Sequence, residues 1–424
     1  MRILRRLGAL ILLALLGLVM NFAATFVDSP ALRQHAAQGL NMLREAGATP
    51  QAVGGFAISQ ADNFSSVLIL KTAAYTGAES RLARTLGGFR VDLPAAMGED
   101  AWDAFCRYAD GRQSPTGGLS YTRYWHGYTL PLRLLLSLTT LSNVQMLLLF
   151  AQLALSGAIL AMLGRRAPGL IAPFLCAFFL MMPPVTGTCL QFAPVTLLML
   201  AGCALLLLWP ALAGEWAFFA ALGMATCYLD LLTFPTVTLS FSLTLALALG
   251  LGEGLRGRAL ARRSVVCAAA WGMGYAGMWA AKWALIALLL PLGASGVWAQ
   301  LALRLSARSG SLSFSRAGAL LENLRLITGK TALRAVLLLG TLAALLPRPR
   351  RAAPRALCLL WPALLPVLFM LATANHIHDH PYFTYRNLAG TVFAALATVS
   401  LALHPAGSGE RKDDGATDLL RQGL

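Results

Sequence analysis

Long apolar runs separated by short polar connections dominate the chain. A transmembrane helix needs about 20 mostly apolar residues, and by that measure the sequence predicts about ten spans. They lie near residues 7–27, 143–163, 169–183, 193–209, 216–230, 234–252, 265–291, 331–346, 357–374 and 387–403. This pattern predicts an all-α integral membrane protein.

The basic residues of the short connections predict the orientation of these spans. Arg and Lys cluster near residues 2–6, 165–166, 256–263 and 348–355. All four clusters fall on one side if about ten spans alternate, and basic connections mark the cytoplasmic side. We therefore expect an uncleaved first helix, both termini in the cytoplasm, and a multi-pass protein of the plasma membrane, with a bacterial inner membrane as the expected location.

The longest polar stretch, residues 28–128, falls outside the cell in this topology. Its acidic and basic residues are equal in number. Within it, residues 30–46 carry apolar positions on one side and predict an amphipathic helix that lies flat at the interface. We expect four regions, namely a first transmembrane helix (1–27), a large external loop with amphipathic helices (28–128), a multispanning domain (129–403) and a cytoplasmic tail (404–424).

Composition supports this interpretation and excludes several classes of protein. Of the 424 residues, 57% are hydrophobic and only 12% are charged, whereas soluble proteins carry roughly a quarter charged residues. The formal charge of +16 comes mostly from the cytoplasmic connections, so it indicates membrane topology and contact with lipids, and not a nucleic-acid partner. The cysteines lie mainly in apolar runs, which indicates small buried groups and no disulfide framework.

The richest polar segment is the sequence from residue 375 to residue 386. It places His376, His378, Asp379 and His380 in one short turn at the mouth of a span, and Tyr385 and Arg386 follow. Histidine and carboxylate ligands could hold a divalent cation, although the spacing is not diagnostic of a metal site. The same groups could hydrogen-bond phosphate and sugar hydroxyls, with Arg386 gripping a phosphate. A solvated turn with an interface belt of aromatic residues is the structural alternative.

Two carboxylates precede apolar helices in the external loop. Asp28 lies where the first span emerges, and it either acts as a general base near the membrane surface or belongs to the capped start of the next helix. Pro30 would then occupy the first helical position. Asp62 opens a further apolar run and has the same two interpretations.

Two charges lie inside the apolar runs. A cationic aromatic segment, residues 121–128, also lies before the second predicted span. Asp230 and Lys282 either pair with each other, or Lys282 meets an anionic headgroup, since an intramembrane charge is a functional hypothesis by default. In the segment Tyr121–Tyr128, Arg123 and His126 could bind phosphate or hydroxyls while Trp125 and its neighbours stack on sugar rings. An interface anchor is the plain alternative.

This arrangement resembles the GT-C class of polyprenyl-phosphate-sugar-dependent membrane glycosyltransferases. The resemblance covers topology over most of the chain, namely a cytoplasmic N-terminus, a first span, a large first external loop with flat helices and many later spans. Asp28 matches the acidic residue near the start of that loop, although the family's acidic pair is a single residue here. The segments around Trp125, Asp230 and His380 also look like those of bacterial multispanning proteins.

The resemblance implies transfer of a sugar from a polyprenyl-phosphate carrier to an acceptor at the extracytoplasmic face. Asp28 or Asp62 would take the acceptor's proton, and Arg123, Lys282 and Arg386 would neutralise the departing lipid phosphate. The histidines and Tyr385 would position sugar hydroxyls or a cation. The alternative from another class is a multispanning transporter or lipid-carrier flippase, in which Asp230 and Lys282 line a path through the bilayer.

Overall fold

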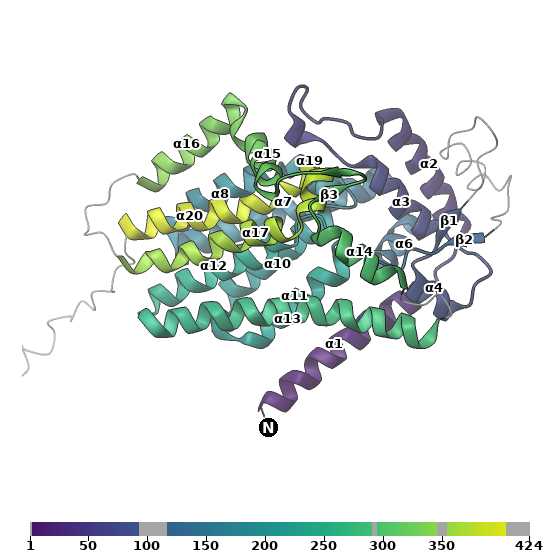
Figure 1. The fold of residues 1–424 in the computed structure, drawn as a ribbon, viewed down its shortest axis with the longest axis horizontal. Coiled ribbons are helices and arrows are strands. Elements are labelled where there is room, and N and C mark those ends of the chain that lie inside the picture. Colours follow the sequence, from purple (N-terminus) through teal and green to yellow (C-terminus); the bar gives the residue numbers. More distant parts are fainter. Residues whose placement is uncertain (1, 93–116, 291–294, 346–353, 404–424) are drawn as a thin grey trace, which may run out of the picture.

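The computed structural model describes residues 2–92, 117–290, 295–345 and 354–403. The described chain is mostly helical and has only two short two-stranded sheets. The expected tail (404–424) and residues 93–116 of the expected external loop lie outside the described residues. The all-α class is therefore confirmed at the level of secondary structure (Figure 1).

The larger part of the molecule is a bundle of roughly aligned helices (Figure 1). Its α-helices are α1 (Arg2–Ala24), α7 (Leu141–Arg166), α8 (Ile171–Leu180), α9 (Pro183–Thr188), α10 (Ala193–Leu208), α11 (Trp216–Leu229), α12 (Thr236–Gly252), α13 (Gly257–Leu289), α16 (Thr331–Leu345), α17 (Leu360–Ala372) and α20 (Asn387–Leu403). Short 3₁₀ turns at Pro168–Leu170, Pro210–Gly214 and Pro354–Leu359 connect some of them.

Two groups of shorter elements complete the described chain. The first consists of α2 (Pro30–Ala46), the 3₁₀ turn Ala57–Ser59, α3 (Asn63–Ala74), α4 (Arg81–Gly87), α6 (Thr129–Leu138), and the antiparallel strands β1 (Arg90–Asp92) and β2 (Gly117–Leu119). The second consists of α14 (Ser295–Leu305), the antiparallel strands β3 (Arg308–Ser309) and β4 (Leu312–Ser313), α15 (Arg316–Thr328), α18 (Ala374–Asp379) and α19 (Pro381–Thr384).

The amphipathic helix expected at residues 30–46 is confirmed with these bounds as α2. Ser29 caps its start by accepting a hydrogen bond from the Leu32 amide, and Pro30 occupies the first position, where a missing N–H costs nothing. The predicted apolar side, which includes Leu40 and Leu43, is buried against α3 and α6. The apolar side of α2 therefore packs on these two helices, whereas the sequence pattern suggested that it could lie on the membrane interface.

Two helices, Ile3–Ala24 and Leu141–Arg166, are long and apolar enough to cross a membrane within the described ranges. A third appears if Arg316–Thr328 and Leu333–Ala343, which meet at 80°, form one span. Helices also occupy the other expected positions, but most are shorter than 18 residues. One reason is that the chain breaks at proline: α8 ends just before Pro183, since the residue before proline avoids helical geometry.

Helix α12 runs through the middle of the bundle and is buried along nearly its whole length. It contacts α10, α11, α13, α17 and α20. Its hydroxyl side chains need partners in this apolar interior: the Thr238 hydroxyl lies 2.8 Å from that of Thr226 and accepts a bond from Trp271 Nε1 at 3.1 Å. These bonds fix α11 and α13 around the central helix.

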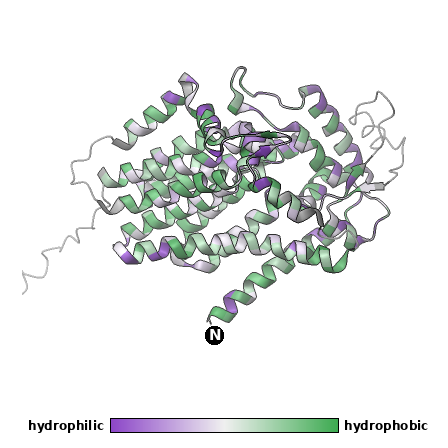
Figure 2. Cartoon of the chain, viewed as in Figure 1, coloured by the Kyte–Doolittle hydropathy of each residue, from purple (hydrophilic) through white to green (hydrophobic). Residues whose placement is uncertain are grey.

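The helices of the bundle consist mostly of hydrophobic residues (Figure 2). Large exposed hydrophobic side chains include Ile3, Leu7, Ile11, Leu15 and Val19 of α1, Met146, Leu147, Phe150 and Leu153 of α7, Val265 and Met273 of α13, and Trp361, Leu364 and Leu368 of α17. Exposed apolar patches of this kind often mark contacts with protein or membrane. The fold is therefore consistent with a membrane protein.

Helices α11 and α13 approach each other closely where two glycines face the opposite backbone. A Cβ added to Gly223 would lie 2.1 Å from the Trp271 carbonyl oxygen, and one added to Gly274 would lie 2.1 Å from that of Ala220. Small residues allow helices to approach in this way inside membranes.

We predict that Gly274→Ala lowers the stability of the protein. The added methyl group meets a backbone carbonyl, and overpacking of this kind typically costs about 1–3 kcal/mol. Gly272→Ala on the same helix is the control, because nothing lies within 4 Å of its added Cβ; alanine there should leave stability unchanged or raise it by up to about 1 kcal/mol. Thermal unfolding of the purified variants measures both, and equal unfolding temperatures would contradict the prediction.

Candidate functional site

A cavity of about 580 Å³ lies between the segment 120–124, α13, α14 and the end of α17. Its volume is typical of sites for small molecules. We call it the aromatic–arginine cavity, after the side chains of Tyr121, Arg123, Tyr124, Tyr275, Trp279, Trp283 and Arg304 that line it together with apolar residues.

One wall of this cavity is a series of packed aromatic rings. The ring centroids of Tyr121 and Tyr124 are 5.6 Å apart, those of Tyr124 and Trp279 are 5.6 Å apart, and those of Trp279 and Trp283 are 5.0 Å apart. The two tryptophans lie one helical turn apart on α13, so they share a face. Such a wall can contact either an apolar chain or the face of a sugar ring.

The charged groups of the cavity are two arginines from different elements. Arg123 lies over the rings of Tyr121 and Tyr124, with its guanidinium carbon 5.7 and 5.9 Å from their centroids. Arg304, near the end of α14, donates to Asn375 Oδ1 at 3.1 Å, and its Nε has no acceptor within the described part of the chain. No carboxylate is among the lining residues that the structure describes. The cavity therefore suits an anionic group with an apolar or sugar portion.

The turn between α11 and α12 closes the cavity beside Leu232. Asp230 accepts bonds from the backbone N–H of Thr233 at 2.9 Å and from its hydroxyl, which forces a tight turn. Leu232 takes a positive φ of 64°, an uncommon conformation for a branched residue. Its carbonyl oxygen accepts a bond of 2.5 Å from His376 Nε2. Because a carbonyl only accepts, Nε2 carries the proton.

His376 is buried and neutral. Burial, and then the charges of His380 and Arg304, hold the pKa of His376 well below its usual value. Its other ring nitrogen has no partner among the described residues. His376 thus joins the polar segment 375–386 to the turn that Asp230 forms. Leu232 of that turn lines the cavity.

The other polar side chains of that segment diverge from His376. His378 stacks on Phe314 with centroids 4.0 Å apart, Asp379 accepts a bond of 3.0 Å from Asn375, and His380 stacks on Phe383 at 5.3 Å. Across the described ranges, the structure brings together no group of three His, Cys, Asp or Glu side chains that could hold a metal ion. The divalent cation suggested by the sequence therefore has no ligand set at this turn.

Asp62 is a buried carboxylate that contacts Tyr382, two residues after His380. It caps α3 by accepting from the Ser65 amide and hydroxyl, both at 2.8 Å, and it accepts a third bond from the Tyr382 hydroxyl at 3.3 Å. Burial lowers the pKa of His380, Arg304 lowers it further, and the negative charges of Asp379 and then Asp62 oppose them. Asp62 therefore both starts a helix and acts electrostatically on His380.

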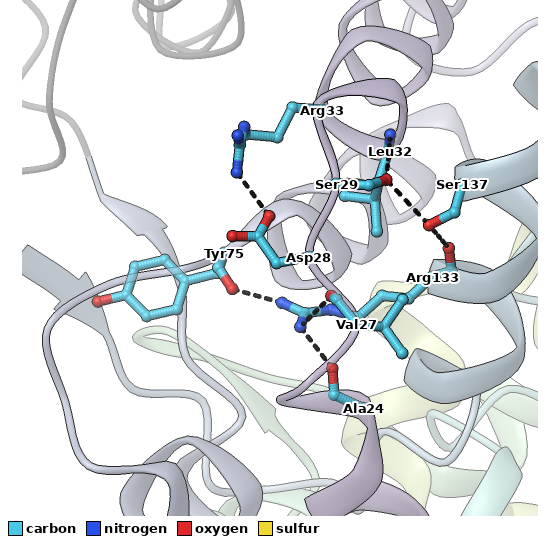
Figure 3. A network of polar contacts seen from close by, with 9 residues as sticks. All are labelled: Ala24, Val27, Asp28, Ser29, Leu32, Arg33, Tyr75, Arg133 and Ser137. Atoms are coloured by element: carbon cyan, nitrogen blue, oxygen red, sulfur yellow. Dashed lines mark hydrogen bonds and ion pairs between the residues drawn. The ribbon is translucent and has the colours of Figure 1, made fainter.

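Asp28 lies at the end of α1, away from the lining of the aromatic–arginine cavity. Its carboxylate forms an ion pair of 2.5 Å with Arg33, and 45% of its side chain is exposed (Figure 3). Its neighbour Ser29 is the residue that caps α2. Of the two predicted bases, Asp62 is thus the buried one and Asp28 the solvated one.

Arg386 and Tyr385, predicted to contact substrate, are buried inside the protein. Arg386 donates to the carbonyl oxygens of Met181, Tyr382 and Ile58 at 3.0 to 3.2 Å. The Tyr385 hydroxyl donates to the Ile58 carbonyl at 2.9 Å. Neither residue lines the cavity. Both satisfy carbonyl groups that helix ends and turns leave open.

The predicted residues on the other side of the segment Tyr121–Tyr128 also contact protein. Trp125 Nε1 donates to the Met278 carbonyl at 2.8 Å. His126 Nε2 donates to the Tyr121 carbonyl at 2.9 Å, so its Nδ1 accepts from the Tyr128 hydroxyl at 2.8 Å. Both ring nitrogens of His126 are therefore occupied.

The ion pair between Asp230 and Lys282, one of the two alternatives that the sequence offered, is not formed. Asp230 is used by the turn that it caps, as described above. Lys282 is 1% exposed, its Nζ lies 5.8 Å from the ring centroid of Trp125, and it has no hydrogen-bond partner within the described ranges. The sequence does not reveal this because Asp230 sits at a helix end, where its own turn supplies nearer donors.

Arg304 and Tyr275 are two of the lining residues that sequence reasoning missed. Arg304 lies near the end of α14, and its position after an apolar run is a signal that could have singled it out. Tyr275 lies one turn before Trp279 on α13, and the repeat of aromatic residues at positions 275, 279 and 283 marks one face of that helix.

Comparison of the chain with models of protein families, with curated proteins and with solved structures finds no match. The candidate site therefore rests on the geometry described above.

We predict that His126 makes the stability of the protein depend on pH. Burial, together with the charge of Lys282, lowers the pKa of His126 from its usual 6.5 to about 3. Below pH 6.5 the unfolded chain takes up a proton that the folded chain refuses, so stability falls by up to about 1.4 kcal/mol per pH unit as pH drops toward 3.

Thermal unfolding between pH 7 and pH 4.5 measures this effect. His126→Gln removes the titrating group and should reduce the slope of unfolding temperature against pH. Tyr128→Phe removes a hydrogen bond to the ring but keeps the histidine, so it should lower stability while keeping the slope. The same slope in His126→Gln and in the wild type would contradict the assignment.

Proposed function

We propose that the protein is a multispanning membrane glycosyltransferase of the GT-C type, which transfers a sugar from a polyprenyl-phosphate carrier to an acceptor at the extracytoplasmic face. The observation that carries the proposal is the aromatic–arginine cavity. It combines an apolar volume, stacked aromatic rings and two guanidinium groups without a carboxylate among its described lining residues. A lipid phosphate bearing a sugar presents the same three chemistries to a protein.

The arrangement in the membrane is part of this proposal. About ten helices would cross the bilayer, with short ones joined end to end, and both termini would lie in the cytoplasm. The exposed apolar side chains of α1, α7, α13 and α17 support this, since lipid would cover them. The basic connections support the orientation, and the cavity would then open at the outer leaflet.

The proposed reaction gives roles to groups that line the cavity and to Asp62 and His376, which are not among its lining residues. Arg123 and Arg304 hold the lipid phosphate and stabilise the charge that grows on it as the bond to the sugar breaks. Trp279 and Trp283 contact the first isoprene units or the sugar face. Asp62 takes the proton of the acceptor hydroxyl as that oxygen attacks the sugar, since it is the buried one of the two candidate carboxylates. His376, held neutral, positions the wall beside Leu232.

We predict that Arg304→Gln weakens use of the donor. Loss of one charged hydrogen-bonding group should raise the KM for a radiolabelled polyprenyl-phosphate sugar about tenfold, which corresponds to about 1.4 kcal/mol. Arg308→Gln removes an exposed arginine of the same external stretch and should leave KM unchanged. The proposal fails if the wild type cleaves none of a broad set of such donors, or if Arg304→Gln and Arg308→Gln behave alike.

The same assay separates the two candidate bases. Asp62→Asn should lower kcat by about 10²- to 10⁴-fold, because asparagine cannot accept the proton, while it should still cap α3, since asparagine is a good helix cap. Asp28→Asn should retain most of the activity, because Asp28 is solvated and paired with Arg33. The reverse order of the two variants would assign the base to Asp28.

A lipid-carrier transporter or flippase is the second candidate. It is favoured by Lys282 of α13, which is buried and has no hydrogen-bond partner among the described residues. An intramembrane cation of this kind often marks a substrate path. Purified protein in vesicles distinguishes the two functions. A flippase moves an intact polyprenyl-phosphate sugar between leaflets and requires Lys282. A transferase instead breaks the bond between the sugar and the carrier and passes the sugar to an acceptor.

A further inference from the structure

A second, much smaller cavity lies at the outer end of α1. Its volume is about 40 Å³, and its polar lining residues include Asn21, Thr25, Thr72, Tyr75, Arg84, Thr85, His126, Thr129 and Arg133. One water needs about 10–15 Å³ of such space, so the cavity has room for about three waters or for one small oxyanion group. We call it the α1-end cavity. The segment Tyr121–Tyr128 contributes to both cavities: Trp125 and His126 line this one, and Tyr121, Arg123 and Tyr124 line the larger one.

Two guanidinium groups reach the α1-end cavity from different elements. Arg133 of α6 is 4% exposed and donates to the carbonyl oxygens of Ala24, Val27 and Tyr75 (Figure 3). These bonds fix the position of its charge. Arg84 of α4 is half-buried, and within the described ranges it makes neither a hydrogen bond nor an ion pair, while its Nε is shielded from solvent. A shielded cationic donor without an acceptor is costly.

The nearby carboxylates are committed elsewhere. Asp28 is paired with Arg33, and Glu79 accepts a bond of 2.5 Å from the hydroxyl of Tyr75, which lines the cavity. Further positive charge surrounds the site, because Lys282 and Arg90 both act to lower the pKa of His126 after burial has done so. The neutral ring of His126 has both nitrogens occupied. Among the described residues, the lining of the cavity therefore holds two guanidinium groups and no carboxylate, and Arg84 Nε has no acceptor.

We propose that the α1-end cavity is a binding site for a phosphate group, with Arg84 as its recognition residue and Arg133 as the fixed charge behind it. The planar fork of a guanidinium donates two parallel bonds to a phosphate. The phosphate comes either from the headgroup of a lipid, since the cavity lies where α1 ends, or from a free phosphate ion. The site is distinct from the aromatic–arginine cavity, and the proposal does not depend on the glycosyltransferase function.

The test measures phosphate binding to the purified full-length chain in two arms. The first arm titrates the protein in detergent with radiolabelled inorganic phosphate by equilibrium dialysis. The second arm places it in nanodiscs of phosphatidylcholine with or without phosphatidic acid and counts retained phosphatidic acid by native mass spectrometry. Saturable binding in the first arm identifies a free ion as a ligand, and retention of phosphatidic acid over phosphatidylcholine in the second identifies a lipid headgroup.

Three variants connect the binding to this cavity. Arg84→Gln should weaken the binding at least tenfold, and Arg84→Lys should retain part of it because it keeps the charge. Arg81→Gln on the same helix is the matched control, since Arg81 lies over the ring of Phe26 at 4.2 Å and does not line the cavity. Thermal unfolding checks that each variant is folded, which we expect because Arg84 makes no bond within the described structure.

Three results would overturn the proposal. The first is the absence of saturable phosphate binding, or of preferential retention of phosphatidic acid, in both arms. The second is binding that Arg84→Gln and Arg81→Gln weaken to the same extent. The third is binding that Arg84→Lys retains no better than Arg84→Gln.

Discussion

The structure depends on how helix ends satisfy their carbonyl groups away from water. The last turn of each helix leaves carbonyl oxygens without partners, and they carry the negative end of the helix dipole. Two buried arginines meet this need. Arg133 bonds to carbonyls at the ends of α1 and α3, and Arg386 bonds to the carbonyl of Met181 after α8 and to that of Tyr382 in α19. Each guanidinium thereby holds several helix ends together and fixes the polar end of the bundle.

This constraint separates the arginines that bind helix-end carbonyls from the arginines that line the cavity. Because Arg386 is surrounded by carbonyls and by the rings of Phe192, Phe234 and Tyr385, it is part of the framework and not of the cavity. Arg123 and Arg304 lie instead among aromatic side chains at the edge of a large apolar volume. Arg133 and Arg386 hold helix ends together, whereas Arg123 and Arg304 give the cavity its positive charge. Such preorganisation lets a site stabilise developing negative charge without rearranging.

Apolar run length located the helices well, because burial in an apolar bundle and membrane insertion both require it. Local chemistry also placed the start of α2, where Ser29 and Pro30 form a helix cap. Contacts distant in sequence could not be obtained this way. Local sequence does not give the partners of Arg386, which binds carbonyls 205 and 328 residues away, or show that Arg304 lines a cavity with Arg123. The partner of each arginine depends on packing, and a single sequence does not record it.

Crosslinking with a photoactivatable polyprenyl-phosphate analogue tests most directly whether the aromatic–arginine cavity holds a lipid phosphate. The account predicts that light attaches the analogue to α13 near Trp279 and Trp283 and to α14 near Arg304, and that an unlabelled polyprenyl phosphate competes for both sites. Peptide mapping by mass spectrometry locates the adducts. Labelling spread over the lipid-facing sides of α1 and α7, or labelling that the competitor leaves unchanged, would contradict it.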